Sequence, residues 1–179
     1  TTITTTGEIT STYLEAISAQ QGATTTGDLV ITSTNVSSRA GILASNQGSG
    51  ALTISTSGTV TGTGSTGIYA LQGTNALGDL SISVADIQSY GTAIMATNNG
   101  SGSTRITATG TVVGDTEAGI VAIQGATAGD LVVQAADVSA NYNAIATRNE
   151  GTGGTTITTT GEITSTYLEA ISAQQGATT

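Results

Sequence analysis

Short runs of alternating apolar and polar residues recur along the whole chain, separated by turns rich in Gly, Ser and Asn. Alternation with a period of two is typical of β-strands, because successive side chains point to opposite faces of the backbone. The sequence has no sustained apolar stripe with the helical period of 3.6, and its abundant Thr, Ile and Val favour strands. The pattern therefore predicts an all-β protein.

The alternating runs belong to an internal repeat. Gly-Asp-Leu occurs at residues 27–29, 78–80 and 129–131, which gives a period of 51 residues. Each period divides into two related halves, marked by an apolar column with steps of 28, 23, 28, 24, 27 and 24 residues. This column consists of Ile3, Ile31, Ile54, Ile82, Ile106, Val133 and Ile157. A repeat of 23–28 residues with three short strands predicts a single-stranded parallel β-helix, or β-solenoid, of about seven coils.

Two further apolar columns mark the second and third strands of each coil. The second strand is centred on Ile9, Val36, Val60, Ile87, Val112, Val138 and Ile163. The third begins with Ile17, Ile42, Ile68, Ile94, Ile120 and Ile145. Because one coil cannot bury its own apolar side chains, we expect the coils to stack at about 4.8 Å each, with Ile, Leu and Val inside and Thr, Ser and Tyr outside. A different β-solenoid or a β-sandwich is the alternative.

The repeat also predicts the organisation of the chain. We expect one β-helix segment over residues 1–179, built from two-coil repeats at residues 1–51, 52–102 and 103–154 and a further coil at residues 155–179. The last coil repeats Thr1–Thr25 without change as Thr155–Thr179. We therefore expect a fragment of a longer array, whose open strand edges continue covalently or by end-to-end self-association.

Composition excludes several classes of function. The chain has 12 acidic residues, 3 Arg and no Lys, and a formal net charge of −9, so it repels nucleic acid. It has no Cys and no His, which removes disulfides, thiolate nucleophiles and the commonest metal ligands. It has no apolar run of the roughly 20 residues that a membrane-spanning helix needs. We expect no cofactor, no bound metal and no membrane insertion of this segment.

Two sets of polar residues recur in alternate coils. Asp28, Asp79 and Asp130 each follow Gly and precede an inward Leu, and we expect them to bond to nearby backbone N–H groups in turns. About 9.6 Å separates neighbours of this set, too far for a shared calcium ion. Asn35, Asp86 and Asp137 precede the second strand, where other coils have Glu8, Thr59, Thr111 and Glu162. We expect this second set to form a hydrogen-bonded corner ladder.

A column of side-chain amides lies beyond the third strand, four residues after its first Ile. It consists of Gln21, Asn46, Gln72, Asn98, Gln124, Asn149 and Gln175. If these amides point inward, they can bond to each other along the axis and to the turn backbone. We interpret the column as a structural ladder, with a ligand-binding polar track as the alternative.

Catalysis is not expected. Asp115 and Glu117 lie in one loop, as the paired carboxylates of a glycosidase would, but no aromatic platform matches them among Tyr13, Tyr69, Tyr90, Tyr142 and Tyr167. A β-elimination site would need a basic residue beside calcium-binding acids, and Arg39, Arg105 and Arg148 are dispersed along the chain. We predict no catalytic, cofactor-binding or metal-binding residues. A carbohydrate-active β-helix enzyme is retained as the alternative.

Rows of outward Thr residues suggest ice binding as a further alternative function. Outward pairs on the first strand are Thr4/Thr6, Thr32/Thr34, Ser55/Ser57, Ser83/Ala85, Thr107/Thr109, Val132/Gln134 and Thr158/Thr160. Regular Thr-x-Thr rows resemble the ice-binding faces of some antifreeze proteins, but Ser, Ala, Val and Gln interrupt this one. High β-propensity is the simpler reason for Thr.

Four motifs give the chain a resemblance to the repetitive passenger region of bacterial autotransporters and related large surface adhesins. They are ITxTGxI (residues 3–9; residues 106–112 differ only in ending with Val), GIYA (67–70), GDLSI (78–82) and NNGSG (98–102). The resemblance implies secretion from a Gram-negative cell, a right-handed β-helix and a role in adhesion or surface structure. No site residue of the family is matched.

We therefore expect a non-catalytic structural and adhesive segment of a bacterial cell-surface or secreted extracellular filament. In such a segment stacked coils supply length and stiffness, because each coil is stabilised by its neighbours.

Overall fold

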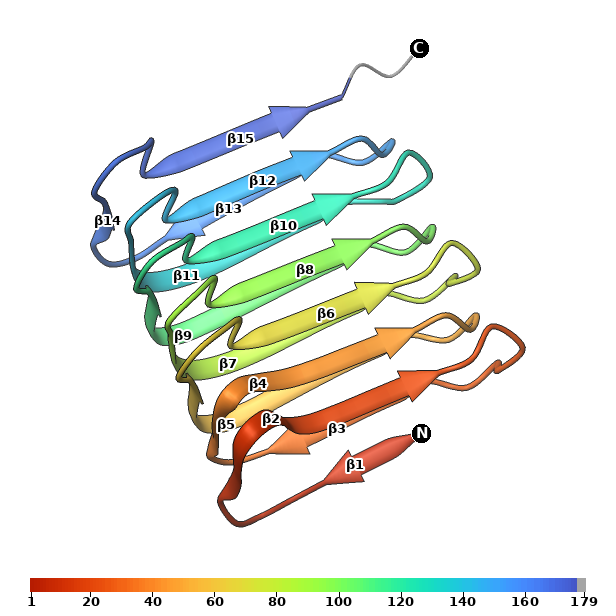
Figure 1. The fold of residues 1–179 in the computed structure, drawn as a ribbon. Helices are drawn as coiled ribbons and strands as arrows, with labels where there is room; N and C mark the ends of the chain where they lie inside the picture. Colours follow the sequence, from red (N-terminus) through yellow and green to blue (C-terminus); the bar gives the residue numbers. More distant parts are fainter. Residues whose placement is uncertain (177–179) are drawn as a thin grey trace.

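The computed structural model describes residues 1–176 and confirms the predicted fold class. The chain winds into a β-solenoid of about seven turns, visible as stacked coils in Figure 1. Every strand pairing in the described residues is parallel, and these residues contain no helix. The last three residues of the predicted coil 155–179 lie outside the described residues.

Seven coils are numbered here from the first strand of one coil to the first strand of the next. Their bounds are residues 1–28, 29–51, 52–79, 80–103, 104–130, 131–154 and 155–176. Each coil contributes one strand segment to each of three faces of the solenoid.

The first face begins every coil. It consists of β1 (Thr2–Thr4), β3 (Leu29–Ser33), β13 (Thr155–Thr159) and the first halves of β5 (Leu52–Gly62), β7 (Leu80–Ser89), β9 (Thr104–Gly114) and β11 (Leu131–Ala140). The second face consists of the first halves of β2 (Ile9–Gln21) and β4 (Val36–Asn46), the second halves of β5, β7, β9 and β11, and β14 (Ile163–Ser165).

The third face lies toward the viewer in Figure 1. It consists of the second halves of β2 and β4 followed by β6 (Ile68–Gln72), β8 (Ile94–Asn98), β10 (Ile120–Gln124), β12 (Ile145–Asn149) and β15 (Ile171–Gln175).

Two of the three predicted strands are fused in most coils. In coils 3 to 6 the first and second strands form one bent strand, and the pairing shifts at the bend, for example between Val84 and Ile87 in β7. In coils 1 and 2 the second and third strands are fused instead. In β7 only Ala85 and Asp86 separate the two inward positions Val84 and Ile87.

The pairing register confirms all three apolar columns. Ile54 lies opposite both Ile31 and Ile82 on the first face, and Ile87 lies opposite Val60 and Val112 on the second. On the third face Ile94 lies between Ile68 and Ile120.

The columns fill one continuous interior. Ile68, Ile94 and Ile120 are fully buried, and Ile17 at the lower end of the third column is 5% exposed. In the last coil Ile171 is 43% exposed, because no described strand covers it. Burial thus comes from the neighbouring coils and is lost at an end, as the stacking argument requires.

Candidate functional site

The recurring acidic residues hold neighbouring coils together. Oδ1 of Asp28 accepts a hydrogen bond from the backbone N–H of Ala51 in the next coil, at 2.8 Å. Asp79 accepts one from Ser103, and Asp130 accepts one from Gly154, both also at 2.8 Å. The predicted turn role is therefore correct, with the detail that each bond crosses to the next coil and joins coils 1 to 2, 3 to 4 and 5 to 6.

The second polar set joins the remaining coil pairs at a different corner. Asn35 accepts a hydrogen bond from the N–H of Thr59 at 3.0 Å, which joins coils 2 and 3. Asp86 and Asp137 bond in the same way to Thr111 and Glu162, at 2.8 and 2.7 Å. The predicted corner ladder exists, but its bonds run to backbone N–H groups. Each of the six coil interfaces thus has one such side-chain bond, alternating between two corners.

A glycine is required above each member of the second set. An added Cβ at Gly110 would lie 2.2 Å from Oδ1 of Asp86, far inside van der Waals contact. Gly58 and Gly161 stand over Asn35 and Asp137 in the same way, each at 2.1 Å. Gly7 occupies the same place in coil 1, and its Cβ would meet nothing within 4 Å.

The predicted amide column is confirmed in position, and its members face the interior. Gln72 lies opposite Asn46 and Asn98, and all three are fully buried. The expected bonds between neighbouring amides are absent from this column; its side chains bond to turn backbone instead. A coil spacing of about 4.8 Å is longer than an N–H···O bond, whereas turn carbonyls lie within reach.

Gln and Asn alternate because the turns that they close differ in length. Asn98 Nδ2 donates to the carbonyl of Gly102, four residues later, at 2.8 Å. Gln72 Nε2 donates to the carbonyl of Gly78, six residues later, at 2.6 Å. The longer side chain thus closes the longer turn of the odd-numbered coils. The amide oxygens of Gln21, Gln72 and Gln124 are buried and have no hydrogen-bond partner among the described residues.

The two candidate glycosidase carboxylates have different surroundings. Oε2 of Glu117 accepts hydrogen bonds from the N–H and the hydroxyl of Thr92 in the preceding coil, at 3.2 and 2.8 Å. Asp115 is exposed, and its backbone N–H donates to the Ser89 carbonyl. Glu117 therefore acts as a further link between coils.

The three arginines are as dispersed as the sequence indicated. Arg105 donates to Gln134 on the first face, and Arg148 pairs with Glu150 beyond the third strand of coil 6. Arg39 lines a hollow at the corner before the third face, together with Tyr13.

Within residues 1–176 no three acidic side chains are close enough to hold a metal ion. The described residues also include no helix with the length and apolar character to span a membrane.

The outward Thr row is aligned but mixed. Thr4, Thr32, Ser55, Ser83 and Thr107 lie in one column of the first face. The next member is Gln134, which lies opposite both Thr107 and Thr158. The predicted pair Val132/Gln134 is therefore wrong by two residues, since Val132 pairs with Arg105. Two Ser residues and a bulky Gln interrupt the regular Thr spacing expected of an ice-binding face.

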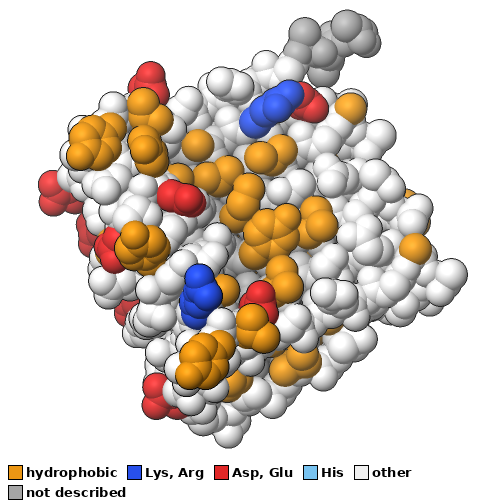
Figure 2. All heavy atoms as spheres, viewed as in Figure 1, with side chains coloured by type: hydrophobic (Ala, Val, Ile, Leu, Met, Phe, Trp, Pro, Cys, Tyr) orange, Lys and Arg blue, Asp and Glu red, His pale blue; other side chains and the backbone are white. Residues whose placement is uncertain are grey.

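The third face carries the main feature that sequence reasoning missed. One of its outward columns holds apolar, partly exposed side chains in all five middle coils. This column runs through Leu43, Tyr69, Met95, Val121 and Ala146. The second outward column adds Leu71 and Ile123, which alternate with the polar residues Ser45, Thr97 and Arg148. Figure 2 shows these side chains as an orange band across the middle of the face. We call the seven residues the apolar band. Polar Ser18 and Ser172 bound the first column.

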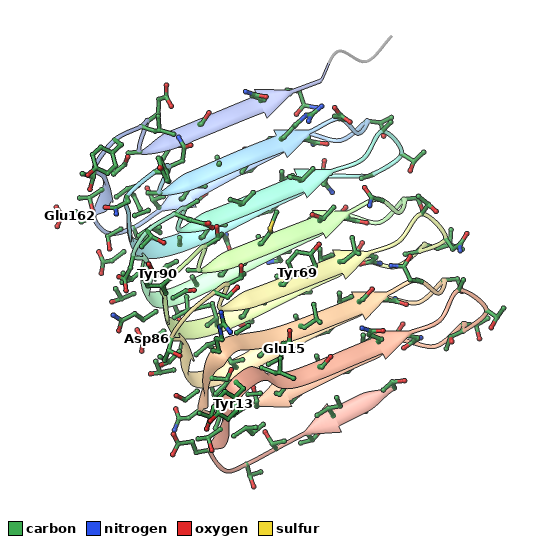
Figure 3. The ribbon with its side chains drawn as sticks, in the orientation of Figure 1. Tyr13, Glu15, Tyr69, Asp86, Tyr90 and Glu162 are labelled. Carbon is green, nitrogen blue, oxygen red and sulfur yellow. The ribbon has the colours of Figure 1, made fainter. Side chains whose placement is uncertain are left out.

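Exposed aromatic rings line the corner beside this band. Tyr13 is 79% exposed and Tyr90 54%, and the rings of Tyr142 and Tyr167 lie 6.2 Å apart. Figure 3 places Tyr13 and Tyr90 at this corner and Tyr69 over β6, with Glu15 between Tyr13 and Tyr69. A shallow open hollow of about 220 Å³ is lined by Glu15, Leu43 and Tyr69 among others. Exposed apolar surface of this kind is suited to contact with a partner, because contact removes it from water.

The signal for the apolar band was present in the sequence. The third strand reads GIYALQG in coil 3 and GIVAIQG in coil 5, so its outward positions are apolar as well as its inward ones. The prediction placed apolar residues inside and polar residues outside in every strand, and it therefore did not include the outward apolar residues of the third strand.

We predict opposite effects of the same substitution at two equivalent glycines. Gly110→Ala should lower the free energy of unfolding by about 1–2 kcal/mol, because the new methyl group would lie 2.2 Å from Oδ1 of Asp86, which bonds to Thr111, and 2.9 Å from the Ala85 carbonyl oxygen. Gly7→Ala meets no neighbour and should be neutral or stabilising by up to about 1 kcal/mol. Urea denaturation measures both changes. Equal stability of the two variants would contradict the proposed role of the carboxylate.

Comparison with known proteins gives no match: no protein family, curated protein or solved structure is significantly similar to the chain.

Proposed function

We propose that the chain is a non-catalytic structural segment of a bacterial cell-surface or secreted fibre, in which stacked coils form a stiff rod. The observation that carries the proposal is the uninterrupted register of inward residues through all seven coils. Because each coil depends only on its neighbours, such a stack is lengthened by adding coils without changing any existing contact. Length is then the property that the repeat supplies.

The use made of the acidic side chains supports a non-catalytic role. Asp28, Asp79, Asp130, Asp86, Asp137 and Glu117 all accept hydrogen bonds from a neighbouring coil. Side chains held in this way resist shear between coils, which is useful in a rod. The bacterial surface location rests on the resemblance of the coil motifs to autotransporter passengers and large adhesins.

The apolar band is the surface best suited to adhesion. It spans five coils, or about 19 Å along the axis at the spacing of parallel strands. The first face at the same level presents mainly Ser and Thr, which water solvates well, and its outward valines, Val30 and Val132, lie four coils apart. We place adhesive contact on the third face for this reason.

Rod formation predicts linear growth. A chain carrying residues 1–154 twice before residues 155–179 should be longer than the present chain by about 29 Å, since six coils are added at about 4.8 Å each. Small-angle X-ray scattering measures the maximum dimension, and the cross-section should stay constant. A longer chain with an unchanged maximum dimension and a thicker cross-section would contradict the rod.

Adhesion through the third face is tested by adding the same charge to two faces. Tyr69→Glu with Val121→Glu should reduce attachment of protein-coated beads to octyl-coated glass about tenfold, because charge replaces apolar contact surface. Ser55→Glu with Thr107→Glu adds the same charge to the same two coils on the first face and serves as the control. Both double variants should keep the β-sheet circular dichroism spectrum. Equal attachment of the two would exclude the apolar band as the adhesive surface.

A further inference from the structure

The short turn of coil 4 contains Asn99-Gly100, which is the one Asn-Gly pair in the sequence. Such a pair is prone to deamidation, because Gly has no side chain to hinder the approach of its backbone nitrogen to the Asn side chain. Asn99 is exposed, whereas Gly100 is buried. The turn therefore combines an accessible amide with an attacking nitrogen on a buried residue.

Deamidation requires that the N–H of Gly100 be free. A base removes its proton, the nitrogen forms a bond to Cγ of Asn99, and the side-chain nitrogen takes up a proton and leaves as ammonia. The product is a five-membered succinimide, which water opens to leave aspartate or isoaspartate at position 99. An N–H held in a buried hydrogen bond reacts only when the structure around it opens.

The fold holds this N–H in a buried hydrogen bond. The Gly100 N–H donates to Oδ1 of Asn98 at 2.9 Å, and Asn98 is fully buried. Nδ2 of Asn98 donates to the Gly102 carbonyl at 2.8 Å, so both ends of the amide are fixed. The side chain that closes the turn from inside thus also holds the proton that deamidation must remove.

Coil 3 restrains the same turn through the backbone. The N–H groups of Asn99 and Ser101 donate to the carbonyls of Gln72 and Ala76, both at 2.9 Å. An added Cβ on Gly100 would lie 2.4 Å from the Ala76 carbonyl oxygen, so Gly100 has no room to shift toward coil 3. Release of the Gly100 N–H from its bond therefore requires the turn to open.

The short turns of coils 2 and 6 have the same geometry without the reactive pair. The equivalent bonds join Gly48 to Asn46 at 2.9 Å and Gly151 to Asn149 at 2.8 Å. The residue at the position of Asn99 is Gln47 in coil 2 and Glu150 in coil 6. Attack on Gln would form a six-membered ring, which closes more slowly, and Glu has no amide to lose. Of these three turns, only that of coil 4 combines the bond with a reactive Asn.

We propose that Asn99 is a latent site of spontaneous deamidation, which the buried amide of Asn98 keeps intact while the turn is closed. Deamidation then proceeds only from molecules in which the turn of coil 4 has opened, and the changed residue is a permanent record of that opening. The inference concerns a covalent change within coil 4 and does not depend on the proposed function.

Isoaspartate at position 99 would prevent the turn from closing again. It routes the main chain through the former side chain and lengthens the chain by one carbon atom. Because Gly100 has no free space beside Ala76, the lengthened turn cannot restore the bond to Asn98 together with the two backbone bonds to coil 3. A modified molecule therefore keeps a local defect between coils 3 and 4.

The first test compares the full chain in buffer and in guanidinium chloride at the same mildly alkaline pH. Trypsin releases residues 40–105, because Arg39 and Arg105 flank this segment, and tandem mass spectrometry locates the modified residue. Deamidation of Asn99 should be at least about tenfold slower in the folded chain. This ratio should agree within about threefold with the factor by which folding slows hydrogen exchange of the Gly100 N–H, because both processes need the same N–H to be freed.

The second test removes the acceptor of the hydrogen bond. Asn98→Ala should speed deamidation of Asn99 in buffer at least about tenfold. Asn46→Ala makes the same change in the equivalent turn of coil 2 and serves as the control, in which the rate at Asn99 should stay as in the unmodified chain. Both variants should keep the β-sheet circular dichroism spectrum, and the first test needs no variant.

Three outcomes overturn the proposal. Equal deamidation rates in the folded and unfolded chain would show that the closed turn gives no protection. A deamidation ratio far from the hydrogen-exchange ratio would show that release of the Gly100 N–H does not control the reaction. A folded Asn98→Ala variant that deamidates no faster than the unmodified chain would show that Asn98 is not the protecting group.

Discussion

A single coil of this chain cannot bury its own aliphatic side chains, and every other feature of the structure depends on that constraint. Inward Ile residues such as Ile68 and Ile94 are fully buried with a coil on each side; Ile171 in the last coil is 43% exposed, whereas Ile17 in the first coil is 5% exposed with coil 2 alone beside it. Stacking at one residue register is then compulsory, because a shift of one position would turn each apolar column outward. The parallel pairing, the closed interior and the open ends all follow.

At the corners of the solenoid, polar side chains rather than aliphatic contacts join neighbouring coils. Each coil interface has one Asp or Asn side chain that accepts a backbone N–H from the next coil, and the two corners used alternate with coil number. This alternation matches the alternating turn lengths, which Gln and Asn close from inside. The acids that first suggested chemistry thus join neighbouring coils, while the apolar side chains of the third face stay partly exposed.

Most of the fold could be predicted from the sequence because the repeat reports the same position seven times. Ile3 to Ile157 form one column since any other register would expose them, and the step lengths alone locate it. The bonding of the amide column could be predicted only in part: bonds to the turn backbone and bonds between neighbouring amides were both expected, and only the bonds to the turn backbone are present, because a short Asn reaches its own turn more easily than the next coil. The pair Val132/Gln134 was misplaced although the sequence locates it, because Gln134 follows Val133 of the first apolar column just as Thr107 follows Ile106. The apolar band was missed because Leu43 and Val121 read as ordinary strand residues.

Residue-resolved amide hydrogen exchange tests the dry stacked interior most directly. The backbone N–H groups of Ile68, Ile94 and Ile120 donate to carbonyls of the next coil at 2.8–2.9 Å beneath fully buried side chains. A dry stacked interior predicts that these amides exchange more slowly than any others and that protection falls coil by coil toward both ends, reaching its lowest value at residues 171–175. Exchange at Ile94 as fast as at Ile171 would contradict it, because the two positions would then be equally open to water.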